Sequence, residues 1–132
     1  MNSNLNTAFF WVPGPLPGLN EIIAAAKSGR GSANAYHRVK KQWTNTVAVQ
    51  CLSAGLHRQP FKGPVRICLD WIEPNRRRDR DNVSCGAKFV IDGLVAAGVI
   101  SSDGWNTLYS IVTTWAVDKN RPGVAVTILA VP

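Results

Sequence analysis

The apolar residues of this chain switch between two spacings along its length, and this switching limits what the chain can fold into. In some segments aromatic and β-branched residues cluster or alternate with polar ones, which is typical of strands. In others the apolar residues recur every three or four positions, which is typical of one face of a helix. The predicted strands are residues 7–12, 65–72, 108–117 and 124–131, and the predicted helices are residues 20–27, 34–52 and 84–97.

Turn-forming residues separate these segments. Residues 13–18 (PGPLPG) form a connector rich in Pro and Gly, and Gly55 and Gly98 follow predicted helices as stop signals. Asn20 is the expected N-terminal cap of the first helix, and the stretch 28–32 (SGRGS) is expected to be mobile. The order β-α-β-α-β-β predicts a single domain of the α+β (mixed α/β layer) class that spans all 132 residues.

Composition predicts a soluble protein of a reducing compartment. Hydrophobic residues make up 45% of the chain and charged residues 17%, which is enough for a packed core and argues against disorder. Cys51, Cys68 and Cys85 form no C-x-x-C pair, so a structural zinc site is not predicted. The N-terminal residues do not resemble a signal peptide, and no apolar run approaches the roughly 20 residues that cross a bilayer. We therefore expect a cytoplasmic protein without a membrane partner.

The positive charge is concentrated in two segments. The chain has 15 Lys and Arg against 8 Asp and Glu, a net charge of +7. Residues 27–41 contain basic side chains and no acid, and residues 76–80 are almost all arginine. Positive charge speeds encounter with phosphate backbones, so a nucleic acid is the favoured partner and a merely basic surface is the alternative. The candidate DNA-binding residues are Lys40, Lys41, Arg76, Arg77, Arg78 and Arg80.

Asp79 and Asp81 stand among these arginines, directly before Asn82. Local charge balancing on a solvated loop is the simpler interpretation of an isolated Asp-x-Asp. The functional interpretation is a magnesium site, because Mg²⁺ prefers oxygen ligands and commonly takes one or two carboxylates with phosphate oxygens. An extended segment would point both carboxylates to the same side. Asp103 is the candidate third carboxylate, and either the chain returns it to the pair or a second subunit supplies it.

Lys88 lies four residues before Asp92 in a predicted helix. An ion pair within the helix, worth a few tenths of a kcal/mol, is the simpler interpretation. Alternatively, Lys88 faces the acidic residues and neutralises charge on a scissile phosphate. The five tryptophans are expected mainly in the core or in interfaces, although an exposed one could stack on bases.

Taken together, these residues resemble the RusA family of Holliday-junction resolvases (crossover junction endodeoxyribonucleases), in particular its phage-borne branch. An ordered set of motifs over about residues 8 to 130 is more specific than any one of them. The motifs are PGPLPGLNEII at 13–23, KKQW at 40–43, RRRDRDN at 76–82, K-x-x-x-D-G-L at 88–94, AAGVI at 96–100 and DGW at 103–105.

The resemblance implies a homodimeric, magnesium-dependent endonuclease that cuts four-way DNA junctions by paired phosphodiester hydrolysis in recombination and repair. By motif, Asp79 and Asp81 match the family's Asp-x-Asp-Asn carboxylates, Asp103 matches the second acid of a later Asp-Asp pair, and Lys88 matches the lysine that opens the following helix. Asp79, Asp81 and Asp103 would hold one or two Mg²⁺ ions, and Mn²⁺ is expected to substitute.

Two departures from the family pattern keep other functions open. Ser102 stands where many members have a further acid, and Lys88 lies seven residues after Asp81 because VSCGA lengthens the spacer. One alternative is a DNA-binding recombination accessory protein without catalysis. Another is a nuclease that acts on flaps or mismatched ends.

Overall fold

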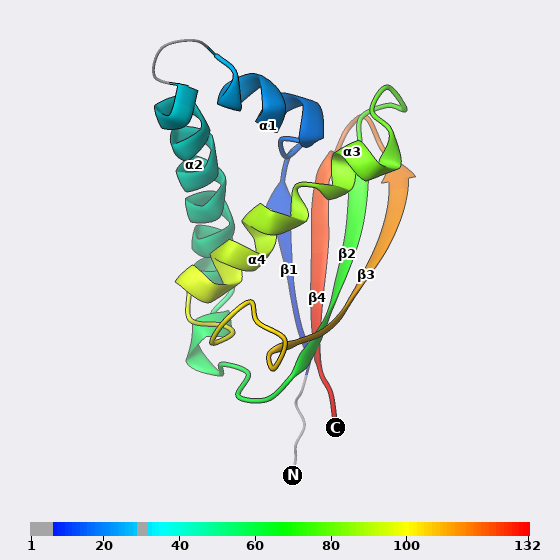
Figure 1. The fold of residues 1–132 in the computed structure, drawn as a ribbon. Helices are drawn as coiled ribbons and strands as arrows, with labels where there is room; N and C mark the ends of the chain where they lie inside the picture. Colours follow the sequence, from blue (N-terminus) through cyan, green and yellow to red (C-terminus); the bar gives the residue numbers. More distant parts are fainter. Residues whose placement is uncertain (1–6, 29–31) are drawn as a thin grey trace.

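The described part of the protein is a four-stranded sheet with helices packed on one side (Figure 1). The computed structural model describes residues 7–28 and 32–132, so the centre of the expected mobile stretch, residues 29–31, lies outside the described residues. The strands are β1 (Thr7–Pro13), β2 (Val65–Glu73), β3 (Leu108–Val117) and β4 (Gly123–Ala130). The helices are α1 (Leu19–Ala26), α2 (Ser32–Ser53), α3 (Arg80–Ser84) and α4 (Ala87–Ala96), and a 3-10 turn covers Leu56–Arg58.

The strand order in the sheet is β1-β4-β2-β3. β4 is antiparallel to both β1 and β2, whereas β2 and β3 are parallel. Parallel neighbours need a crossover connection, and here α3 and α4 supply it. The crossover therefore joins the carboxyl end of β2 to the amino end of β3, at opposite ends of the sheet.

The core lies between the sheet and the helices, and alternation along β2 shows which face is buried. Val65, Ile67, Leu69 and Trp71 are at most 2% exposed, and the residues between them are less buried. On the helix side, α2 and α4 pack together so closely at Gly93 that any side chain there would overlap Val47. One continuous cluster of apolar residues thus holds strands and helices together.

The predicted class is confirmed: the protein is a single α+β domain with the predicted order of strands and helices. β3 has the predicted bounds, and Gly55 and Gly98 both have φ of 76°, the left-handed conformation that suits a residue after a helix. The prediction that Asn20 caps the first helix is wrong. Gly18 is the capping residue, and its N–H donates a 2.7 Å hydrogen bond to the carboxylate of Glu21.

The third predicted helix, 84–97, is two helices in the structure. The first begins at Arg80, and the break falls near Gly86, before α4 begins. A Cβ at Gly86 would lie 3.0 Å from the Trp71 ring, which is a tight contact, so glycine favours the close approach of the chain to this core tryptophan. This contact is between distant parts of the sequence, and local periodicity does not reveal it.

Among the residues that the structure describes, no helix is both long enough and apolar enough to cross a membrane.

Candidate nucleic-acid and metal site

Asp79 and Asp81 lie at the start of α3, beyond the carboxyl end of β2. Asp79 is the capping position, with extended backbone, and its side chain makes no capping hydrogen bond. Asp81 is in the first helical turn, and its Oδ1 accepts a 2.9 Å hydrogen bond from the Asn82 N–H. The expectation that both aspartates belong to an extended segment is therefore wrong, because the helix begins between them. Carboxylates at this end of a helix are favoured by its dipole.

Asn82 fixes the position of this short helix. Asn82 is 8% exposed, and its side-chain oxygen accepts a 3.1 Å hydrogen bond from the backbone N–H of Asn20. The Asp-x-Asp-Asn sequence thus places two exposed acids on a turn whose next residue is anchored to α1. In this sequence the Asn82 side chain is buried, whereas the carboxylates of Asp79 and Asp81 are exposed to solvent.

An open cavity of about 430 Å³ lies beside Asp79, over the carboxyl ends of β2 and β3. The Arg80 guanidinium lies 5.7 Å from the centre of the Trp115 ring, and Trp115 Nε1 donates a 3.0 Å hydrogen bond to Ser84 Oγ. These contacts hold an aromatic ring and a cation side by side at the cavity wall. The lining residues are Glu73, Asn75, Arg76, Arg78, Asp79, Arg80, Trp115, Ala116 and Val117.

Arg78 differs from its neighbours because its guanidinium is engaged inside the protein. It donates two 2.8 Å hydrogen bonds to the carboxylate of Glu73, one to Glu21 at 2.9 Å and one to the carbonyl of Leu16 at 2.9 Å. The hydrogen bond to Glu73 is the main reason that the pKa of Arg78 is raised. The side chain is 18% exposed and ties β2 to α1, and Arg78 also lines the cavity at α3.

The same contacts set the protonation of Glu21. Burial alone would raise the pKa of this carboxyl group, but hydrogen bonds from the Gly18 N–H and from Arg78 outweigh it and lower the pKa below its usual value. Glu21 is therefore an anion at neutral pH, and it links the α1 cap to Arg78.

Lys88 lies in α4 between two carboxylates. Its Nζ is 3.3 Å from Asp92 Oδ1 and 3.5 Å from Asp103 Oδ2. The hydrogen bond to Asp92 is the main cause of a raised pKa of Lys88, with Asp103 acting in the same direction. The i, i+4 ion pair between Lys88 and Asp92 therefore forms. Lys88 also contacts Asp103, a candidate metal ligand.

Asp103 belongs to a second hollow, of about 720 Å³, between α2, α4 and the turn before β3. The turn is held by a 2.9 Å hydrogen bond between the hydroxyls of Ser102 and Thr107. Ser102, where the resembled family often has an acid, is thus a structural element of this turn. The hollow is lined by His37, Lys40, Lys41, Thr44, Asn45, Asp92, Val95, Ala96, Ser101, Ser102 and Asp103.

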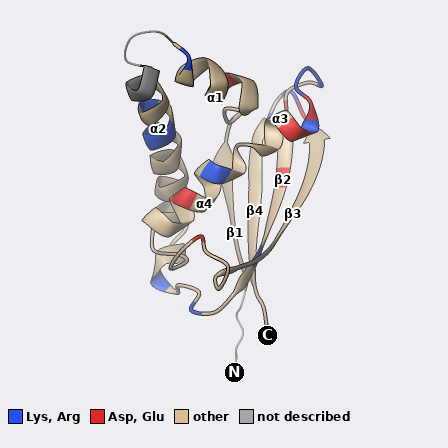
Figure 2. Cartoon of the chain, viewed as in Figure 1, with Lys and Arg blue, Asp and Glu red and all other residues tan. Residues whose placement is uncertain are grey.

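The two parts of the candidate site are separate within one chain. Among residues 7–28 and 32–132, no three Asp, Glu, His or Cys side chains come together closely enough to hold a metal ion. Figure 2 shows the acids of α3 well apart from the acid in the loop after α4. Asp79 lies with arginines at one end of β3, and Asp103 lies with lysines near the other. The sequence left two possibilities for Asp103: either its own chain or a second subunit brings it to Asp79 and Asp81. Within one chain, the fold does not bring Asp103 to the other two aspartates.

Trp105 is one of the five tryptophans that could stack on bases, and the local sequence did not distinguish it from the others. Its side chain is 99% exposed, two residues after Asp103, in a turn closed by hydrogen bonds from the N–H groups of Thr107 and Leu108 to the Gly104 carbonyl. A fully exposed indole on a hydrogen-bonded turn is suited to stacking on a planar ring. The Asp-Gly-Trp sequence signalled the turn, but exposure depends on the surrounding fold.

No protein-family model matches this chain. No curated protein matches it either.

Proposed function

We propose that this protein is a magnesium-dependent endonuclease that cuts branched DNA, with four-way junctions as its substrate, as the resemblance to the RusA family implies. The observation that carries the proposal is the cavity at α3. There, the carboxylate of Asp79 lies beside Arg76, Arg80 and the ring of Trp115. An acid that can hold a cation is thus placed among cations that can hold phosphates, which is the combination that phosphodiester hydrolysis requires.

The carboxylates of Asp79 and Asp81 are suitable ligands for Mg²⁺. Both are exposed, and Asp79 makes no capping hydrogen bond that would compete for its oxygens. When bound, the metal would lower the pKa of a coordinated water and stabilise the leaving oxygen. The protein's own contribution is to hold two carboxylates at a helix start anchored through Asn82.

Asp103 and Lys88 would complete the site from a second subunit. Lys88 is a cation at neutral pH, as lysines ordinarily are, and Asp92 and Asp103 raise its pKa further. Its proposed role is to neutralise charge that develops on the phosphate, rather than to remove a proton from water. This assignment keeps the three aspartates of the motif together in function although one chain holds them apart.

The DNA backbone would contact both basic regions. Arg76 and Arg80 line the cavity at α3, and Arg77 is exposed beside them. Lys40 and Lys41 line the hollow that contains Asp103. Contacts of this kind position DNA without reading its sequence.

The test is cleavage of a labelled synthetic four-way junction and of the matching linear duplex, each with Mg²⁺ and with EDTA. We expect paired nicks across the junction that disappear with EDTA and in Asp81→Asn. Asp118→Asn is the matched control, because Asp118 is an exposed aspartate in the turn before β4. Full activity of Asp79→Asn and Asp81→Asn would refute the proposal.

Two alternatives give different outcomes in the same assay. An accessory protein without catalysis is favoured by the separation of the acids within one chain, and it would bind junctions in every metal without nicking them. A flap-directed nuclease would cut a flap substrate faster than the junction.

A further inference from the structure

β3 is an edge strand with an unusual number of exposed apolar side chains. It pairs with β2 on one side, and the sheet order places no described strand on its other side. Five of its ten residues are large apolar residues with 38–62% exposure. They are Tyr109, Ile111, Val112, Trp115 and Val117. An exposed edge of this length offers a row of backbone hydrogen-bonding groups to another strand.

The helical layer covers β3 only in part, through the contacts of Arg80 and Ser84 in α3 with the Trp115 ring. In the β2–β3 register, Ile67 is paired with Ile111 and Trp71 with Trp115, so the members of each pair point to the same face. On β2 these residues are 0% and 2% exposed, whereas on β3 they are 44% and 38% exposed. The helices therefore cover the core as far as β2 and leave the same face of β3 largely exposed, with Trp115 contacted by α3.

The strand also lacks the usual protection of an edge. Its sequence, LYSIVTTWAV, contains no charge and no proline, in a chain of net charge +7. Soluble proteins normally protect exposed edges with lysine, proline or a covering segment. Arg66 and Arg80 lie over the rings of Tyr109 and Trp115, so the middle of β3 is where two copies of such a basic chain meet with the least repulsion between like charges.

We propose that a second copy of this chain pairs with β3 in antiparallel orientation, so that two four-stranded sheets join into one continuous sheet. A two-fold axis between the two β3 strands, beside their middle, pairs the strand with its own copy, which is the usual form of a homodimer interface. The interface is isologous and covers the unpaired edges of both copies. The helical layers of the two copies lie on the same face of the joined sheet.

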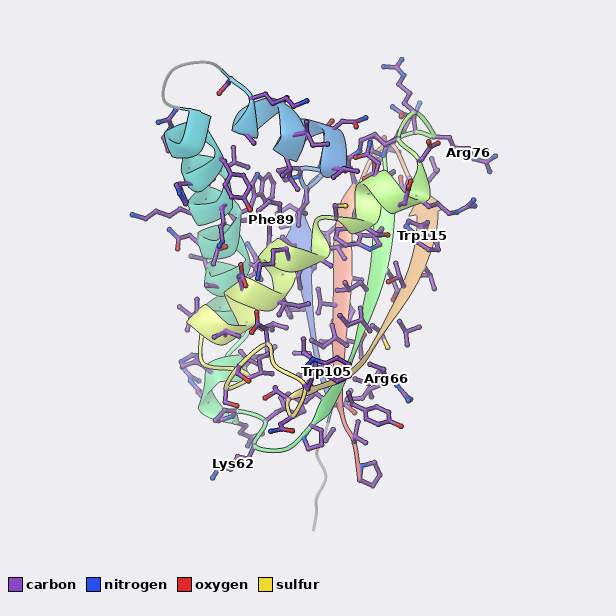
Figure 3. All side chains as sticks on the ribbon, viewed as in Figure 1. Lys62, Arg66, Arg76, Phe89, Trp105 and Trp115 are labelled. Atoms are coloured by element: carbon purple, nitrogen blue, oxygen red, sulfur yellow. The ribbon has the colours of Figure 1, made fainter. Side chains whose placement is uncertain are left out.

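The direction of β3 determines which parts of the two copies this pairing brings together. This step rests on the proposed function. β3 begins five residues after Asp103 and ends at the cavity that contains Asp79. Figure 3 shows Trp105 and Trp115 toward opposite ends of the strand. Antiparallel pairing sets the Asp103 end of one copy against the Asp79 end of the other. The dimer thus has two equivalent regions in which acids of both copies face the same stretch of DNA.

The alternation of side chains restricts the register. Directly opposed residues of an antiparallel pair point to the same face, so odd-numbered residues of β3 oppose odd-numbered residues of the second copy. With Thr113 on the two-fold axis, Ile111 lies opposite Trp115 of the second copy, a favourable pair of a β-branched and an aromatic side chain. This register is centred within half a residue of the midpoint of the strand, which lies between Val112 and Thr113.

The first test is the oligomeric state by light scattering. We expect the wild-type protein to be a dimer and Val112→Lys to be a monomer with an unchanged circular dichroism spectrum. Phe9→Lys is the matched control, since Phe9 is 59% exposed on the other edge strand, β1, and this variant should remain a dimer. A monomeric wild-type protein, or a dimer lost in Phe9→Lys and kept in Val112→Lys, would overturn the proposal.

The second test is a symmetric disulfide. In a Cys68→Ser, Cys85→Ser background, Thr113→Cys should form an intermolecular disulfide on mild oxidation, because opposed residues lie about 4.5–5.5 Å apart between Cα atoms. Thr127→Cys, on the interior strand β4, should stay reduced. Cross-linking through position 127 but not 113 would indicate contact between the open faces of the sheets and would contradict pairing at β3.

The third test asks whether the site is shared. Asp81→Asn and Asp103→Asn are each expected to be inactive alone, whereas an equimolar mixture re-formed from monomers should regain about a quarter of the wild-type sites, as single nicks. An inactive mixture that contains the heterodimer would exclude a shared site. The first two tests do not depend on cleavage, so a β3 dimer that never nicks DNA refutes the proposed function and leaves the interface standing.

Discussion

At the scale of single residues, the arginines of the segment 76–80 have different roles, although they carry the same side chain. Arg78 is largely buried against Glu73, whereas Arg76, Arg77 and Arg80 are exposed. A basic run next to acids in sequence can therefore combine a structural ion pair with a binding surface. The distinction comes from Glu21 and Glu73, which reach Arg78 from α1 and β2.

Replacement of Arg78 should reduce stability more than any other change in this segment. Arg78→Met leaves the carboxylate of Glu73, with a side chain only 10% exposed, without its partner. We expect a loss of about 3 kcal/mol in the free energy of unfolding, the usual cost of stranding a buried charge. Urea denaturation measures it, with Arg76→Met as the control that should change little. Equal stability of the two variants would contradict the role given to Arg78.

The raised pKa of Lys88 gives a prediction for the pH dependence of cleavage. Hydrogen bonds to Asp92 and Asp103 raise the pKa of Lys88 above that of an ordinary lysine, so Lys88 stays protonated as pH rises through the neutral range. Activity should therefore show no fall caused by this lysine between about pH 6 and 9. Lys88→Arg, which keeps the charge, should retain activity, while Lys88→Met should lose roughly a hundredfold. The pH–rate profile of all three proteins measures this, and a lysine-dependent limb in that range would show that Lys88 acts as a base.

At the scale of helices and strands, the sequence predicted most elements because apolar periodicity is a local property. β3 was predicted with its observed bounds, and α2 was predicted to within a few residues. The break near Gly86 was missed because local periodicity does not reveal how closely Gly86 packs on Trp71, a distant residue in β2. The placement of Asp103 could not be predicted for a similar reason, since it depends on how the crossover lies on the sheet.

The contact between α2 and α4 is sensitive to a single methyl group. Gly93→Ala would place a Cβ on the side chain of Val47, and we expect it to destabilise the fold by about 1–3 kcal/mol. Gly63→Ala is the control, because a Cβ there meets no atom within 4 Å. Thermal unfolding of the two variants measures the difference. A stable Gly93→Ala protein would mean that the two helices separate at little cost.

At the scale of the whole molecule, the net charge of +7 should make binding to DNA strongly dependent on salt. Each phosphate contact contributes about 0.9 to the slope of log K against log salt concentration. Arg76→Ala should reduce the magnitude of this slope by about 1. Lys62→Ala should leave it unchanged, because Lys62 lies at the other end of the molecule from Arg76 (Figure 3). Fluorescence anisotropy with a junction at several salt concentrations gives both slopes.

The parallel pairing of β2 with β3 also has a consequence for how activity depends on dosage. A crossover between parallel strands carries the chain from one end of the sheet to the other, so residues just after β2 and just before β3 start far apart. If both groups are needed in one place, their encounter is bimolecular and its extent rises with the square of the subunit concentration at high dilution. Such a nuclease would be nearly silent at a few copies per cell and active once the chain accumulates, without any separate inhibitor.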